Sequence, residues 1–232
     1  MITGDGTTAK FTRKFYGDVP WLWICDDIEM VFGVPQHDAL FGTIVRTVDE
    51  NPDFSDVVVS SQVQIGTTVR LEALFPEKRF AYMPENYRVI ASNPQRPKYW
   101  VCGTRHAELA KVIRIELTDV RANKPYITTV DQVSPEDAEM VKHATNVWLA
   151  MSIQFGKDIA ALGAKFGADP QVVAETLKAD PRIGVGAYIA PHGEPSPHLK
   201  REVWNLQRLG GGKIIDVLEA QRESQSSEAG AS

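Results

Sequence analysis

Short apolar runs alternate with amphipathic segments along the first 130 residues, and this alternation limits the folds open to the chain. Five runs have the composition of β-strands: Ile28–Val34, Asp56–Ser60, Phe80–Met83, Tyr99–Cys102 and Tyr126–Val130. Three segments between them can cover a sheet face as amphipathic helices: Ala39–Asp49, Thr67–Leu74 and His106–Leu117. Short strands separated by helices are typical of a parallel α/β sheet. We therefore expect a doubly wound α/β layer of about five strands.

The pattern becomes helical at residue 134. Ser134 can cap a helix that has Pro135 at its first position and acids in its first turn. The helix can run to about Lys165, because Gly167 and Pro170 follow. Its part from Val147 to Leu162 is apolar on most sides, and such a helix must be buried from several directions. We therefore predict a homodimer through the helix at 134–165.

These patterns divide the chain into four parts. Residues 1–26 form an N-terminal segment, which we expect to be flexible, and 27–133 form the α/β domain. Residues 134–209 form a helical domain with further short helices at about 169–179 and 199–209. Residues 210–232 hold a last helix at 213–222 and a small, polar tail that we expect to be disordered.

Composition excludes several classes of protein. Twenty-five Lys and Arg stand against thirty Asp and Glu, a formal charge of −5, which disfavours nucleic acid as a partner. Two cysteines are too few for a disulfide scaffold. No apolar run reaches the roughly 18 residues of a membrane span, and the first residues do not resemble a signal peptide. We therefore expect a cytoplasmic protein without a membrane or nucleic-acid partner.

Candidate functional residues lie where the predicted strands end, because parallel sheets bind ligands at that edge. The sets are Val34, Pro35 and Gln36; Ser61 and Gln62; Pro84 and Glu85; Gly103 and Thr104; and Asp131. Glu85 is the best acid–base candidate, with a solvated loop carboxylate as the alternative. In the long helix, Lys142 and Asn146 are four residues apart and share a face. They can bind an oxyanion or move a proton in a cleft, or form a plain surface pair.

Two other sequence features give little information about function. The five histidines show no metal-ligand spacing, so we expect no metal site. Gly4, Gly6 and Ala9 match a loose G-x-G-x-x-A, but too few residues precede them for the strand that the dinucleotide fingerprint requires.

Several segments together resemble the UDP-glucose/GDP-mannose dehydrogenase family of nucleotide-sugar dehydrogenases. Residues 134–166 are similar to the start of its central helical domain, with Glu139, Lys142, Asn146, Ala150, Ile153 and Phe155 in the pattern E-x-x-K-x-x-x-N-x-x-x-A-x-x-I-x-F. The other similar segments follow in the family's order: 27–35, 60–68, 83–85, 97–103, 167–184 and 213–224.

The resemblance implies roles for named residues. Lys142, Asn146 and Glu85 would be catalytic, Val34, Pro35, Ser61 and Gln62 would contact NAD, and Lys200 would contact the substrate. The implied fold is a partial Rossmann-like parallel sheet that lacks the first βαβ half, followed by an α-helical dimerisation domain. NAD is the implied cofactor, if the chain uses any, and a nucleotide sugar is a candidate partner.

The departures from the family pattern bear on activity. No glycine-rich cofactor turn with its strand and helix is found before residue 27, and no further nucleotide-binding domain follows the helical part. In GEPSPHLKR (193–201), Pro197 stands where the family has its catalytic cysteine, and Arg201 where it has an aspartate. Gln62 replaces the threonine of S-T-V, and Val89 a second glutamate. Without the thiolate, the aldehyde stage has no covalent route.

Three hypotheses follow from these departures. The chain is a degenerate, non-catalytic dimer that acts through protein contacts, which we favour. Alternatively, it is an enzyme fragment completed by a partner chain, or an NAD-dependent dehydrogenase with an unusual cofactor site.

Overall fold

The computed structural model describes residues 1–31, 34–84, 88–90, 93–95, 99–118, 129–184, 188–189, 196, 199 and 201–203. The chain divides into two compact units, Met1–Lys142 and His143–Ser232. Each unit is described by itself below.

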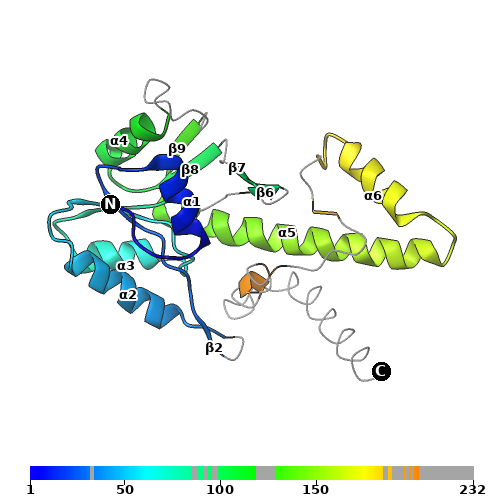
Figure 1. The fold of residues 1–232 in the computed structure, drawn as a ribbon, viewed down its shortest axis with the longest axis horizontal. Helices are drawn as coiled ribbons and strands as arrows, with labels where there is room; N and C mark the ends of the chain where they lie inside the picture. Colours follow the sequence, from blue (N-terminus) through cyan, green and yellow to red (C-terminus); the bar gives the residue numbers. More distant parts are fainter. Residues whose placement is uncertain are drawn as a thin grey trace. The chain divides into compact units, whose positions relative to one another are not determined.

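A five-stranded sheet forms the first unit (Figure 1). Its strands lie in the order β1 (Leu22–Ile24), β4 (Asp56–Val59), β5 (Arg79–Tyr82), β8 (Tyr99–Gly103) and β9 (Thr129–Val133). Neighbouring strands are parallel except β5 and β8, which meet in one antiparallel pair, Tyr82 with Gly103. The predicted α/β class with a mostly parallel sheet of five strands is confirmed.

Helices cover both faces of this sheet. Val57 and Val59 of β4 pack in one core cluster with α2 (His37–Asp49) and α3 (Thr67–Leu74). Val58 points to the opposite face and packs with α1 (Thr7–Tyr16) and α4 (Ala107–Thr118). A β-branched strand buried on both faces is what a doubly wound layer requires. The helices predicted at 39–49, 67–74 and 106–117 are therefore confirmed to within two residues.

The strand predicted at Ile28–Val34 is wrong. This segment instead forms a small antiparallel hairpin of β2 (Met30–Val31) and β3 (Val34–Pro35), outside the main sheet. The strand beside β4 is β1, whose Leu22, Trp23 and Ile24 pair with Val57–Val59 and are fully buried. Ile28 is buried in the core, but Met30, Val31 and Val34 are exposed, so the part of the run that forms the hairpin does not enter the core. A second hairpin joins β6 (Arg88–Ile90) and β7 (Asn93–Gln95). Of the strand predicted at Tyr126–Val130, residues 126–128 lie outside the described residues, and the strand β9 is described over Thr129–Val133.

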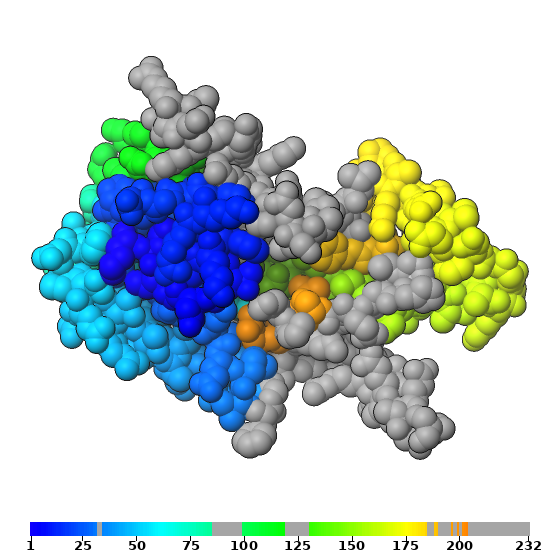
Figure 2. Space-filling view, viewed as in Figure 1, coloured from blue at the N-terminus to red at the C-terminus, as the bar shows by residue number. Residues whose placement is uncertain are grey.

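The N-terminal segment is ordered rather than flexible, which also corrects the expectation. Ile2 forms a parallel bridge with Trp23, through Thr3 N–H to Trp23 O (2.8 Å) and Trp23 N–H to Met1 O (2.8 Å). Ala9 and Tyr16 of α1 are buried in the core, and the residues around them form a closely packed surface (dark blue in Figure 2). A strand-like segment therefore does precede Gly4 and Gly6.

The second unit is helical in its described part. Helix α5 (Pro135–Ala164) begins in the first unit and continues into the second, as predicted. Helix α6 (Pro170–Ala179) is capped by the Asp169 side chain, which accepts from Gln171 N–H (2.8 Å) and Val172 N–H (3.4 Å). Leu199 and residues 201–203 are helical, and Leu199 packs on Ala150 and Ile153. The remainder of the helix predicted at 199–209, the helix at 213–222 and the tail lie outside the described residues. Over the ranges that the structure describes, no helix is long and apolar enough to span a membrane.

Candidate binding site at the carboxyl edge of the sheet

Adjacent parallel strands bring two polar loops to one edge of the sheet. The loop Cys25–Asp27 follows β1, and the loop 60–66 follows β4. Ser60 links three strand ends: it accepts from Trp23 Nε1 (2.8 Å), donates from Oγ to Met83 O (2.7 Å), and its N–H donates to Ile24 O (2.8 Å). This network fixes the loop after β4 relative to β1 and β5.

Three buried polar atoms at this edge have no hydrogen-bond partner in the described part of the chain. They are Asp26 Oδ2, Ser61 Oγ and Gln62 Nε2. Buried polar groups in native proteins are nearly always paired with protein, water or a ligand. Ser61 and Gln62 were both predicted to contact a ligand here, so their positions at the edge agree with the strand-end argument. Their role stays a prediction.

The edge after β1 is acidic. Burial is the main reason that the pKa of Asp26 is raised from its ordinary value, and the nearby carboxylates of Asp5 and Asp27 raise it further. Three carboxyl groups therefore lie close together at the end of β1. Their field opposes the binding of an anion.

Carboxylates of the chain itself occupy the start of two helices. A Cβ added to Gly6, the N-cap of α1, would collide with the carboxylate of Asp27. At α3, the buried Glu139 accepts from Gly66 N–H (2.5 Å), Thr68 N–H (2.8 Å) and Thr68 Oγ1 (2.7 Å). Helix N-termini are the usual place for a phosphate. Here Glu139 takes that place at α3, and the Asp27 carboxylate lies against Gly6, the residue before the first turn of α1.

Glu139 is a functional candidate that sequence reasoning missed, since it entered only as the first residue of the family-like helix pattern. It lies in α5 but binds loop 66–68, more than seventy residues earlier in the chain. Burial raises the pKa of Glu139, while hydrogen bonds from Thr68 and Gly66 oppose that shift. The sequence signal that could have indicated this contact is an acidic residue in the first turns of one helix, together with the G-T-T start of another helix.

The other predicted site residues are dispersed. Val34 and Pro35 lie in the β2–β3 hairpin rather than at the end of a sheet strand. Lys142, half-buried, is the last residue of the first unit, and the buried Asn146 belongs to the second. Glu85 and Lys200 lie outside the described residues. The roles of all these residues stay predictions.

The second unit contains a buried histidine–carboxylate contact that the sequence did not indicate. His143 Nδ1 lies against Glu202 Oε2, and both side chains are almost wholly buried. The pair joins α5 to the short helical segment at 201–203. No group of three or more potential metal ligands occurs among the described residues.

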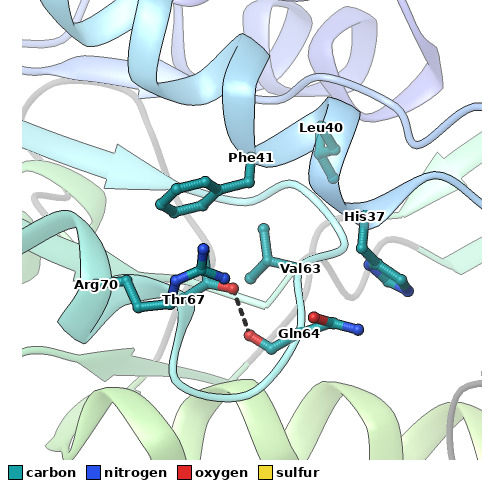
Figure 3. Close-up of a pocket in the computed structure, with 7 residues that line it drawn as sticks. All are labelled: His37, Leu40, Phe41, Val63, Gln64, Thr67 and Arg70. Atoms are coloured by element: carbon teal, nitrogen blue, oxygen red, sulfur yellow. Dashed lines mark hydrogen bonds between the residues drawn. The ribbon is translucent and has the colours of Figure 1, made fainter. Parts of the chain in front are cut away.

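A small pocket lies beside the edge loops of the first unit (Figure 3). Phe41 of α2 and Arg70 of α3 lie on one side of it, with the Arg70 guanidinium 4.0 Å from the centre of the Phe41 ring. The other lining residues are His37, Leu40, Val63, Gln64 and Thr67.

Comparison with solved structures shows that this fold is similar to the fold of nucleotide-sugar dehydrogenases. A UDP-glucose dehydrogenase from Pyrobaculum islandicum superposes with a TM-score of 0.66 at 22% identity, over 86% of this chain and 50% of that one. A GDP-mannose dehydrogenase from Pseudomonas aeruginosa superposes with a TM-score of 0.59 at 17% identity, over 94% and 53%. At these identities the likeness establishes the fold.

Sequence comparison gives a similarity to one family over part of the chain. Residues 136–213 match the model of the UDP-glucose/GDP-mannose dehydrogenase family, central domain. UDP-glucose 6-dehydrogenase YwqF of Bacillus subtilis is 30% identical over 137 residues, 55% of this chain and 30% of YwqF. A UDP-glucose 6-dehydrogenase of P. aeruginosa is 28% identical over 190 residues, 73% of this chain and 40% of that protein. The chain is thus similar to UDP-glucose/GDP-mannose dehydrogenases over part of its length, and it spans two fifths or less of these two proteins.

Proposed function

We propose that this chain is a dimeric, non-catalytic relative of the nucleotide-sugar dehydrogenases, which acts by binding and does not oxidise a nucleotide sugar by itself. The observation that carries this proposal is the position of two carboxylates at helix starts on the sheet edge: Glu139 accepts from N–H groups at the start of α3, and Asp27 lies against Gly6, the N-cap of α1. The proline at position 197, which the resemblance sets in place of a nucleophilic cysteine, supports it.

NAD, the cofactor that the family implies, fits this edge poorly. Its pyrophosphate needs free backbone N–H groups and a positive field. Gly66 N–H and Thr68 N–H already donate to Glu139, and Asp27 lies against the start of α1 beside Asp5 and Asp26. A dianion there would replace an internal carboxylate and approach two others. We therefore assign no hydride transfer to these residues.

A symmetric apolar stripe on α5 supports a second copy of the chain as the partner. Trp148, Phe155 and Leu162 are seven residues apart and are 66%, 49% and 52% exposed. Met151 and Ile159, four residues on either side of Phe155, are half-buried on the same stripe. Seven-residue spacing is the repeat by which helices pair.

The symmetry of the stripe about Phe155 favours an antiparallel pair. In that arrangement Phe155 meets its own copy on the two-fold axis, and Trp148 faces Leu162 of the other chain. Met151 would likewise face Ile159. A two-fold interface must be self-complementary in this way. The apolar stripe extends over about 21 Å of helix, and burying it would stabilise the dimer.

Absorbance of NADH tests the absence of activity. We expect no turnover when the purified chain is mixed with millimolar NAD and UDP-glucose, GDP-mannose or UDP-N-acetyl sugars. Turnover that disappears in Lys142→Ala would contradict the proposal and support an enzyme.

The alternative is an NAD-dependent dehydrogenase of the UDP-glucose/GDP-mannose type, which works either with an unusual cofactor site of its own or with a partner chain that supplies the cofactor half. The unpaired atoms of Asp26, Ser61 and Gln62 favour it, because a bound polar ligand would satisfy them. Calorimetric titration with NAD, and separately with UDP- and GDP-sugars, distinguishes the two. Nucleotide-sugar binding without NAD binding fits the non-catalytic protein, whereas binding of both fits the alternative.

A further inference from the structure

We draw no further inference here: the strongest candidate, the cluster of buried polar side-chain atoms of Asp26, Ser61 and Gln62 at the carboxyl edge of the sheet, belongs to the site already described.

Discussion

At the residue scale, buried charges in this protein bind backbone groups far away in the sequence. Glu139 of α5 accepts hydrogen bonds from backbone N–H groups at the start of α3. Lys78, next to the start of β5, donates to backbone carbonyl groups in the loop after α2. Each would be costly to bury alone, and each instead has several hydrogen-bond partners. They should therefore be among the polar side chains whose loss affects stability most.

Glu139→Gln should lower the free energy of unfolding by about 1–3 kcal/mol, because an amide cannot accept at both of its ends. Since the pKa of Glu139 is raised in the folded state, protonation stabilises the fold. This contribution is present below the ordinary pKa of 4.5 and is lost as pH rises through the folded value. The difference in free energy of unfolding between the unmodified chain and Glu139→Gln should therefore be larger at pH 4.5 than at pH 8.

Urea unfolding across this pH range measures that gap, and Asp137→Asn, an exposed acid in the first turn of α5, is the control. A gap that narrows toward pH 4.5 would contradict a raised pKa for Glu139.

Lys78→Met should also destabilise the protein. The buried Lys78 Nζ donates to Phe54 O (2.7 Å), Pro52 O (3.1 Å) and Asn51 O (3.5 Å). Methionine keeps most of the volume but leaves these carbonyl groups unpaired, at a cost of about 1–3 kcal/mol. Denaturant unfolding checks this, with the exposed Lys111→Met as the control. Equal stability of the two variants would show that water replaces the ammonium group.

At the scale of elements, α5 has two distinct roles. Its first turns belong to the first unit, where Gly103 allows close packing: a Cβ there would collide with Ala138. Its later turns present the stripe Trp148, Met151, Phe155, Ile159 and Leu162 in the second unit. The same helix therefore completes one core and offers a surface for association.

Phe155→Glu should convert the proposed dimer to a monomer. On a two-fold axis a single substitution brings two glutamates together, so it adds like-charge repulsion to the loss of apolar contact. Light scattering of Phe155→Glu at micromolar concentration should then give 25.7 kDa, the mass of one chain. The unmodified chain should give about twice that mass. Phe166→Glu, an 82% exposed residue outside the stripe, should leave the dimer intact.

The direction of the two helices can be tested separately. Trp148→Glu should weaken the dimer, and adding Leu162→Lys should restore it, because an antiparallel pair sets position 148 against position 162 of the other chain. No recovery in the double variant would argue for a parallel pair. A monomeric unmodified chain would contradict the dimer altogether.

At the scale of the whole molecule, thermal stability tests the proposal that NAD finds no open site for its pyrophosphate. A ligand at a hundred times its Kd stabilises a protein by about 2.7 kcal/mol, which raises the Tm of a chain this size by roughly 5–10 °C. We expect millimolar NAD to leave the Tm unchanged. A rise of this size would show that NAD binds, and would favour the alternative of an NAD-dependent dehydrogenase.

Local signals in the sequence determined most helices and the central strands. The β-branched run Val57–Val59 is apolar on both faces, and α5 has a capping serine and a first-position proline at its start. Such signals operate within a few residues, so they can be recognised without a partner. Ser61 and Gln62 were predicted to lie at the ligand edge for the same reason, because they directly follow a clear strand.

Tertiary structure decided what depends on distant partners. The segment 28–34 is as apolar as a strand, but the place beside β4 is taken by Leu22–Ile24, whose side chains are fully buried. Glu139 meets α3 across 71–73 residues of chain, and His143 meets Glu202 across 59. Pairing of this kind is set by how the elements pack, because each partner taken alone is an ordinary polar residue. The sequence by itself therefore determined the class of fold and the position of Ser61 and Gln62 at one edge of the sheet. Packing decided that the carboxylates of Asp27 and Glu139 would lie at the starts of α1 and α3.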